Sequence, residues 1–304
     1  MSALIEGLNP QQIAAVKHEG SPLLVVAGAG SGKTRVLTRR IAYLLAQRNV
    51  APYEVLAITF TNKAAGEMKE RVAQLVGDRA KMMWVSTFHS ACVRILRKEA
   101  SLLGYTNSFT IYDQSDSLRL ITLVMRDMNL DAKRYAPRAV ASLISQAKNE
   151  LMGPADYLNQ AKDQFQEIVA QVFAIYQKRL TGANSMDFDD LIAKTVEVLQ
   201  RYPDARSKYR SRFKHILVDE YQDTNHAQYI LIKELVGNER DGIPPAELCV
   251  VGDADQSIYA FRGANIRNIL QFEADYPNAK TILLEQNYRS TQNILSAANA
   301  VIAN

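Results

Sequence analysis

The stretch Leu23–Arg35, LLVVAGAGSGKTR, decides how the rest of the chain is interpreted. Its first four residues are apolar and partly β-branched, and the residues after Lys33 have apolar positions at helical spacing. Three glycines lie between these two patterns, at positions 28, 30 and 32. We therefore predict a strand, a loop and a helix, with backbone N–H groups of the loop and the helix N-terminus turned toward a polyphosphate.

The Gly-Lys-Thr ending of this stretch predicts a nucleoside triphosphate site. In such a loop Lys33 reaches the β- and γ-phosphates and the Thr34 hydroxyl ligates Mg²⁺. The generic motif has glycine where this chain has Ala27, a departure of one methyl group. The alternative is a flexible glycine turn without a ligand. The loop alone does not predict which reaction follows.

Composition is that of a globular protein of about two domains, at ~150 residues each. The chain has 304 residues, of which 47% are hydrophobic and 22% charged. Without a membrane-length apolar run or a signal-peptide pattern, it is expected to be cytoplasmic. Cys92 and Cys249 stand apart in apolar surroundings and are predicted to be reduced core residues. A net charge of +4 is compatible with a polyanionic partner but is weak evidence for one.

Residues before the loop predict a short helix, with Asn9 as its N-cap and Pro10 at its first position. Gln12 lies in that helix and has two interpretations. Its side-chain amide could read the edge of an adenine, or it could be a surface glutamine. A glutamine in isolation is more often a surface residue, and only its place shortly before a phosphate loop supports the first interpretation.

Two further strands end in hydroxyl and aromatic residues. Val55–Thr59 is followed by Phe60, Thr61 and Asn62, and the run beginning at Val85 repeats the design with Phe88 and His89. Because open α/β sheets bind ligands at the carboxyl ends of their strands, these junctions could hold the backbone of a nucleic acid. In the alternative interpretation, Phe60 and Phe88 are core residues and the hydroxyls are helix caps.

Between about 113 and 187 the alternation of strands and helices stops and several helical patterns follow one another. We predict a helical insertion whose Lys and Arg residues lie on solvated helix faces. A helix over 187–199 begins with three aspartates, Asp187, Asp189 and Asp190. Acidic residues stabilise a first turn, so capping is favoured over metal binding.

A second half of a nucleotide site is predicted where the apolar run His215–Val218 ends in Asp219 and Glu220. Asp219 would hold Mg²⁺, while Glu220 would orient and deprotonate the attacking water. The alternative is a solvated turn, which the Gly-Lys-Thr sequence upstream disfavours.

Another predicted strand, over 248–253, leads into DADQSIYAFRGA. Gln256 would sense whether a γ-phosphate is present. Tyr259 and Phe261 lie two residues apart and would point the same way on an extended backbone, beside Arg262. Such aromatics suit the stacking of unpaired bases, although without this context they would more often be core residues. Finally, we predict a strand from Leu283 that enters a turn at Ser290, with a helix through Ile294 after it.

Taken together, the ordered motifs resemble those of the UvrD/Rep/PcrA family of superfamily one DNA helicases, most closely the PcrA-like members. They cover almost the whole chain, and the Ala27 departure is itself typical of that family. The matching sequences are AGAGSGKT (27–34), TFTNKAA (59–65), DEYQD (219–223), GDADQSIY (252–259) and QNYRS (286–290).

The resemblance implies a RecA-like P-loop NTPase domain of the α/β class, built on a parallel sheet (1–112 and 188–284). An all-helical insertion (113–187) interrupts it, and the first part of a second RecA-like domain follows (285–304). It also implies ATP and Mg²⁺ as cofactors and 3′→5′ translocation on single-stranded DNA or at single/double-strand junctions, in repair or replication. The family's nucleotide-binding positions correspond here to Gln12, Ala27, Gly28, Ala29, Gly30, Ser31, Gly32, Lys33, Thr34, Arg35, Tyr288 and Arg289.

In this resemblance Gln12 reads adenine, Tyr288 stacks on it, Arg35 lies beside the nucleotide and Arg289 is the first arginine finger. The positions that line the DNA track are Phe60, Thr61, Asn62, His89, Tyr259, Phe261 and Arg262. Many relatives have Arg-Trp where this chain has Ala260-Phe261. Because phenylalanine stacks less area than tryptophan, the base grip there is expected to be weaker.

Three functions are weighed for the chain. The first is the amino-terminal part of a DNA helicase motor, with possible repair or replication proteins as partners and no membrane association. The second is a subunit of an AddA/RecB-type helicase–nuclease, and the third is an ATP-gated DNA-binding or protein-displacing module. A second arginine finger is expected beyond Asn304, and such a finger contributes ~10³–10⁵ in rate. This chain alone is therefore expected to bind ATP but hydrolyse it slowly.

Overall fold

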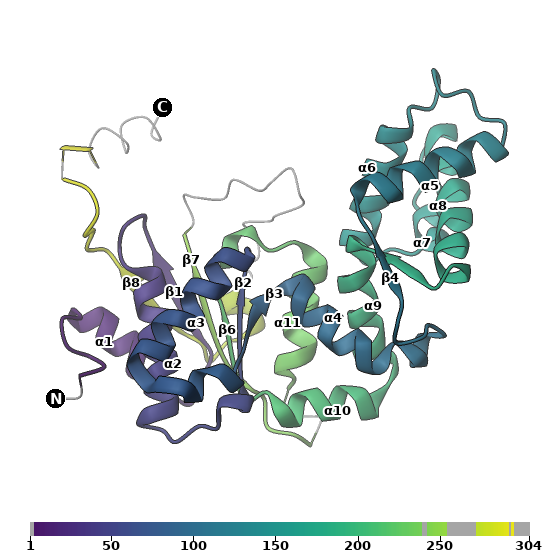
Figure 1. Ribbon diagram of the computed structural model, residues 1–304. Coiled ribbons are helices and arrows are strands. Elements are labelled where there is room, and N and C mark those ends of the chain that lie inside the picture. Colours follow the sequence, from purple (N-terminus) through teal and green to yellow (C-terminus); the bar gives the residue numbers. More distant parts are fainter. Residues whose placement is uncertain (1–2, 239–241, 254–271, 292, 295–304) are drawn as a thin grey trace.

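The computed structural model describes residues 3–238, 242–253, 272–291 and 293–294 of the 304. Within them six strands form one parallel sheet in the order β3-β2-β6-β7-β1-β8 (Figure 1). The strands of this sheet are β1 (Leu23–Ala27), β2 (Val55–Thr59), β3 (Trp84–Thr87), β6 (His215–Val218), β7 (Glu247–Gly252) and β8 (Lys280–Leu284).

Alternating apolar residues give the sheet two buried faces. Leu24, on β1, packs in one hydrophobic cluster with α4 and α9, while its neighbours Leu23 and Val25 pack in another with α2 and α3. Burial on both faces is what continuous apolar runs in parallel strands predict. The helices of this part are α1 (Pro10–Lys17), α2 (Lys33–Ala46), α3 (Asn62–Val76), α4 (Phe88–Glu99), α9 (Phe188–Arg201), α10 (Pro203–Arg212) and α11 (His226–Val236).

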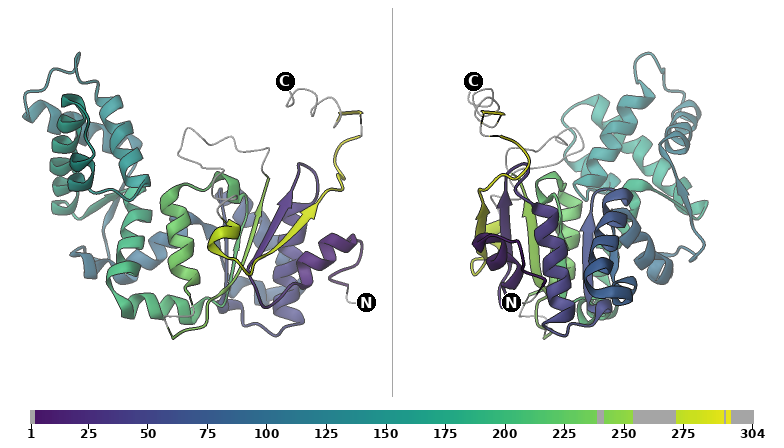
Figure 2. Two further views of the ribbon diagram at one scale, coloured as in Figure 1. Left: turned by 180° about the vertical axis from the view of Figure 1, so that it is seen from behind. Right: turned by 60° about the vertical axis from the view of Figure 1, so that its left-hand side comes forward.

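A separate lobe of helices follows the first half of the sheet, drawn in teal in Figure 1. Its own hydrophobic cluster includes Val140, Val169, Phe173, Tyr176 and Leu180. Its helices are α5 (Gln114–Asp127), α6 (Pro137–Asn149), α7 (Pro154–Asn159) and α8 (Gln164–Gly182). The left view of Figure 2, seen from behind, shows the lobe on one side of the sheet and β8, in yellow, on the other. The chain is thus an α/β sheet domain interrupted by helices, as predicted.

Two short strands join the lobe to the sheet domain, and the sequence patterns do not predict them. β4 (Thr110–Tyr112) and β5 (Ser185–Asp187) pair in parallel where the chain enters and leaves the lobe. The insertion is therefore helical over Gln114–Gly182 but ends in a strand. The last strand of the large sheet is also displaced from its prediction, because β8 ends at Leu284, one residue after the predicted start. The predicted helix beyond 294 lies outside the described residues.

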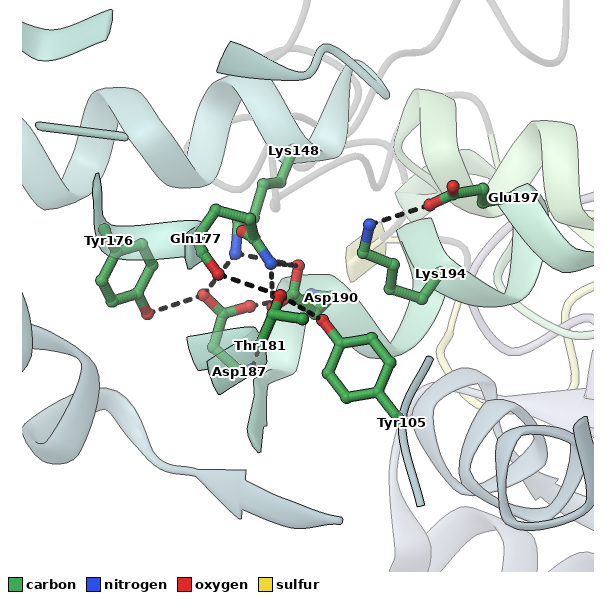
Figure 3. Close-up of polar contacts among 9 residues, drawn as sticks. All are labelled: Tyr105, Lys148, Tyr176, Gln177, Thr181, Asp187, Asp190, Lys194 and Glu197. Atoms are coloured by element: carbon green, nitrogen blue, oxygen red, sulfur yellow. Dashed lines mark hydrogen bonds and ion pairs between the residues drawn. The ribbon is translucent and has the colours of Figure 1, made fainter. Parts of the chain in front are cut away.

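The junction contains a buried ion network, shown in Figure 3. Lys148 of α6 contacts Asp187 at 2.6 Å and Asp190 at 2.9 Å, and Tyr176 donates to Asp187 at 2.8 Å. Burial raises the pKa of Asp187, but the adjacent Lys148 ammonium outweighs it and holds that pKa below its usual range. Lys148 is 4% exposed, so the prediction of solvated Lys and Arg faces is wrong there.

The capping prediction for Asp187 and the core prediction for the two cysteines are confirmed. Asp187 caps α9 by accepting from the Asp190 N–H at 2.8 Å. Cys92 and Cys249 are buried and free. In the part of the chain that the structure describes, no helix is both long enough and apolar enough to cross a membrane. The same residues contain no cluster of three or more metal-ligating side chains of the His, Cys, Asp or Glu type.

Candidate nucleotide-binding site

The glycine-rich loop lies between β1 and α2, at the carboxyl edge of the sheet. Gly30 and Gly32 have φ of +74° and +89°, a left-handed conformation that glycine adopts without strain. Ser31 closes the turn, because its hydroxyl donates to the Gly28 carbonyl at 2.7 Å. At Gly28 an added Cβ would meet nothing within 4 Å. The loop thus requires glycine at two of its three predicted positions.

Lys33 begins α2 and extends toward the ends of two neighbouring strands. Its ammonium lies 3.4 Å from Glu220 Oε2 and 3.5 Å from Asp253 Oδ2, and its side chain is 10% exposed. Glu220 follows β6 and Asp253 follows β7. The residues predicted to bind phosphate and to activate water are therefore in contact, although Lys33 and Glu220 are 187 residues apart.

Asp219 is the first residue after β6 and is almost fully buried. Burial and the neighbouring Glu220 carboxylate raise the pKa of Asp219 to about 6, although the Glu220 N–H donates to it at 3.0 Å. A buried carboxylate of this kind is stabilised by a nearby cation. Thr34, the other predicted ligand, is half-buried at the start of α2. One hydroxyl and one carboxylate fit Mg²⁺, which keeps waters and phosphate oxygens as its other ligands.

Glu220 has an unusual backbone, with φ +49° and ψ +46°. Left-handed conformations cost free energy for residues other than glycine and cluster at functional sites. Gln222, which is buried, donates from Nε2 to Glu220 Oε2 at 2.9 Å and accepts the Asp253 N–H at 3.0 Å. Neither Gln222 nor Asp253 was predicted as a site residue. Both residues belong to acidic motifs that directly follow two adjacent strands, and this position could have identified them.

Gln12 lies beneath the loop instead of on the surface. Its side chain is buried, and Nε2 donates to the Ser31 carbonyl at 3.0 Å while Oε1 accepts the Asn9 N–H at 3.1 Å. The surface interpretation of Gln12 is therefore wrong. Asn9 and Pro10 cap and begin α1 as predicted, which fixes Gln12 against the loop.

The segment after β8 returns to the loop. The Tyr288 N–H donates to the Gly30 carbonyl at 2.9 Å, and the Tyr288 hydroxyl accepts from Asn9 Nδ2 at 2.9 Å. Arg289 lies so close that its Cβ would be 2.6 Å from a Cβ added to Gly30. Arg35 is exposed on α2, with its guanidinium near Gly7. The structure therefore brings Tyr288 and Arg289, but not the Arg35 head group, against the loop.

Four of the residues predicted to line a DNA track, Phe60, Thr61, Asn62 and His89, lie at the carboxyl ends of β2 and β3. Thr61 caps α3 and Asn62 begins it, both exposed. Phe60 is half-buried against Phe88 with ring centroids 5.6 Å apart, whereas Phe88 itself is buried in the core. The core interpretation is thus right for Phe88. Gln256, Tyr259, Phe261 and Arg262 lie outside the described residues.

One aromatic residue at this edge was missed. Phe188, at the start of α9, packs edge-on against His89 with ring centroids 5.7 Å apart and is 49% exposed. The sequence interpretation of 187–190 considered only the aspartates. The position of Phe188 among the acidic residues in the first turn of the helix could have identified it.

A parallel sheet with a glycine-rich loop between its strand β1 and helix α2 defines an α/β domain of the RecA-like class. A model of the UvrD/REP helicase N-terminal domain matches residues 8–277. The chain therefore belongs to that family, as the motifs predicted.

Curated relatives are similar over the whole chain. The ATP-dependent DNA helicase UvrD1 of Mycobacterium tuberculosis is 65% identical over 305 residues, which cover 99% of this chain and 40% of that protein. UvrD1 of Mycobacterium leprae is 63% identical over 309 residues, which again cover 99% of this chain and 40% of that protein. The ATP-dependent DNA helicase PcrA of Staphylococcus aureus is 54% identical over 304 residues, 100% of this chain and 41% of that protein. The chain thus spans about two fifths of the length of these relatives.

Proposed function

We propose that the chain is the amino-terminal motor part of an ATP-dependent DNA helicase that translocates 3′→5′ on single-stranded DNA. The observation that carries this proposal is the position of Lys33, whose ammonium lies within 3.5 Å of carboxylates at the ends of both β6 and β7. A phosphate-binding lysine beside an acidic strand end is the arrangement that P-loop ATPases use. The names of the relatives, which are ATP-dependent DNA helicases, support the helicase part of this proposal.

In the proposed site, ATP binds at the loop with its phosphates on backbone N–H groups and Lys33. Bound Mg²⁺, held by Thr34 and Asp219, would neutralise charge on the β- and γ-phosphates. Glu220 orients the attacking water and takes its proton. Gln222 donates a 2.9 Å hydrogen bond to the Glu220 carboxylate. This bond restricts the orientations that the carboxylate can adopt before the reaction.

The remaining proposed nucleotide contacts surround that centre. Gln12 and Tyr288 recognise and stack on adenine, and both lie beside the loop or its flanking helix. Arg289 reaches the γ-phosphate, and Arg35 lies beside the nucleotide on its exposed side. Gln256 senses the γ-phosphate from the segment after β7.

Single-stranded DNA is proposed to run across the carboxyl ends of β2 and β3. Phe60, Thr61, Asn62 and His89 face it there together with Phe188, and Tyr259, Phe261 and Arg262 are proposed as further contacts with the same strand of DNA. An exposed aromatic packed on a histidine supports base stacking, which contributes ~1–3 kcal/mol per base. Single/double-strand junctions, with repair or replication proteins, are the proposed setting.

Nucleotide binding tests this function most simply. A fluorescent ATP analogue should bind the unmodified chain, and Lys33→Ala should weaken binding at least about tenfold, because it removes a charge-assisted phosphate contact. Lys17→Ala is the matched control, since Lys17 is exposed in the last turn of α1. Equal binding by all three proteins would refute the proposed site.

A further inference from the structure

The segment Glu285–Ser290, which we call the strap, lies against the glycine-rich loop. The Tyr288 N–H donates to the Gly30 carbonyl at 2.9 Å, and Asn287 Nδ2 donates to the Ala29 carbonyl. In a phosphate loop the N–H groups turn toward the ligand. The strap contacts carbonyl oxygens of that same loop, so it can bind without displacing the N–H groups from phosphate.

A single side chain connects the loop to the proposed arginine finger. While Asn287 Nδ2 binds Ala29, its Oδ1 accepts the N–H groups of Arg289 and Ser290, both at 2.8 Å. The second pair is the local turn that asparagine side chains typically form with the backbone that follows them. Because the carboxamide is planar and rigid, the position of the Ala29 carbonyl and the backbone of Arg289 are held by one unit.

The close approach of strap and loop is built into the sequence. A Cβ at Gly30 would lie 2.6 Å from the Arg289 Cβ and 2.9 Å from both polar atoms of the Asn287 amide. Gly30 also has φ +74°, which disfavours other residues. Glycine is therefore required here by the strap as well as by the backbone, an observation independent of the hydrogen bonds.

We infer that Asn287 is a positioning residue that ties the conformation of the loop at Ala29 to the orientation of Arg289. This inference rests on the proposed function, in which Arg289 reaches the γ-phosphate. When the loop closes on a triphosphate, the carboxamide carries that change to the arginine. Asn287 thereby sets how strongly the site prefers a nucleoside triphosphate over a diphosphate, without touching either.

The experiment measures the affinities of ADP and of a non-hydrolysable ATP analogue by competition with a fluorescent nucleotide. The proteins are the 304-residue chain, Asn287→Ala, Arg289→Ala and the double variant. Asn107→Ala is the control, because Asn107 is exposed and precedes β4, the strand that leads into the helical lobe. Asn287→Ala should lower the triphosphate preference about tenfold, at the upper end of the effect of one hydrogen bond. Its ADP affinity should stay within about twofold, and Asn107→Ala should behave as the unmodified chain does.

The double variant separates positioning from simple contact. If Asn287 acts through Arg289, Asn287→Ala should cause no further loss in the Arg289→Ala background, since coupled residues are non-additive. Additive losses, an equal loss of ADP binding or an unchanged preference would each overturn the inference. Asn287→Gln provides a second variant that keeps the amide but moves it by one methylene, and it should show the same loss.

Failure of the proposed function would look different. If the unmodified chain bound neither nucleotide, or if Lys33→Ala bound both as well as the unmodified chain, the nucleotide site itself would be refuted together with this inference. A different pair of results would refute the role of Asn287 alone. In that case Lys33→Ala binds nucleotide more weakly than the unmodified chain, but Asn287→Ala keeps the same triphosphate preference.

Discussion

The carboxamide of Gln222 donates a 2.9 Å hydrogen bond to the carboxylate of Glu220, the proposed catalytic base. Its other end accepts the N–H of Asp253 at 3.0 Å, so a buried neutral side chain joins the ends of β6 and β7. Glu220 is otherwise 38% exposed in its side chain and has a left-handed backbone. Among the described acidic residues of the site, Gln222 therefore restrains the most exposed one.

Gln222→Ala is expected to slow single-turnover ATP hydrolysis about tenfold, which corresponds to about 1.4 kcal/mol in the barrier. The affinity for an ATP analogue should stay within about twofold, because Gln222 does not belong to the phosphate loop. Two quantities are measured for each protein: the rate of hydrolysis at saturating ATP and the Kd of the ATP analogue. Gln47→Ala is the control, since Gln47 is exposed at the end of α2. Equal losses of rate and affinity would contradict a role in orienting the base.

Phe188→Ala is expected to weaken single-stranded DNA binding by about tenfold, within the ~1–3 kcal/mol that stacking on one base contributes. ATP-analogue affinity should not change. Fluorescence anisotropy of a labelled oligonucleotide measures the first, and nucleotide competition the second. Tyr53→Ala is the matched control, because Tyr53 is an equally exposed aromatic that lies before β2, at the opposite edge of the sheet. Losses of the same size in both variants would exclude a specific role for Phe188.

Lys148→Ala is expected to lower the free energy of unfolding by about 3–5 kcal/mol, because it leaves two buried carboxylates without their cation. Chemical denaturation measures the loss. Lys178→Ala on α8, where Lys178 is exposed, should change the same quantity by less than about 0.5 kcal/mol. A loss below about 1 kcal/mol in Lys148→Ala would show that Asp187 and Asp190 are compensated in another way.

Glu247 predicts a pH dependence of stability. Burial raises the pKa of Glu247, but two 2.7 Å hydrogen bonds from Arg48 and the nearby His215 outweigh it and lower that pKa well below 4.5. A carboxyl with a depressed folded-state pKa stabilises the fold above its unfolded pKa, and this stabilisation is lost as the pH falls toward the folded-state value.

The difference in free energy of unfolding between the unmodified chain and Glu247→Gln should therefore be constant from about pH 7 to pH 6 and should shrink by about pH 3. Urea denaturation at each pH measures it. Glu6→Gln, at an exposed glutamate, should show no such trend. A difference that grew as the pH fell would have the wrong sign for a carboxyl with a lowered pKa.

Much of the sheet could be predicted from local sequence. Val55–Thr59 is a strand with the predicted bounds, because a short apolar run between turn residues has few other ways to be buried on both sides. The loop before Lys33 was equally predictable, since its glycines and the Gly-Lys-Thr ending specify a strand, a turn and a helix within thirteen residues.

Features that depend on distant segments could not be predicted in this way. Lys148 is buried only because Asp187, 39 residues later, folds back beside it. Asp253 meets Lys33 across 220 residues. Gln12 is polar and locally indistinguishable from its exposed neighbour Gln11, and it is buried only because the loop lies above it. In each case a tertiary contact decides the environment, and single-residue patterns do not encode it.

The most direct test of the account is single-stranded DNA binding by the 304-residue chain, measured by fluorescence anisotropy with and without a non-hydrolysable ATP analogue, beside Lys33→Ala. Because the loop and the aromatic edge lie at the carboxyl ends of one sheet, we predict that the analogue changes DNA affinity and that Lys33→Ala abolishes this change while retaining nucleotide-independent binding. DNA affinity that is the same with and without the analogue, in a chain shown to bind the analogue, would contradict the claim that the two sites form one motor.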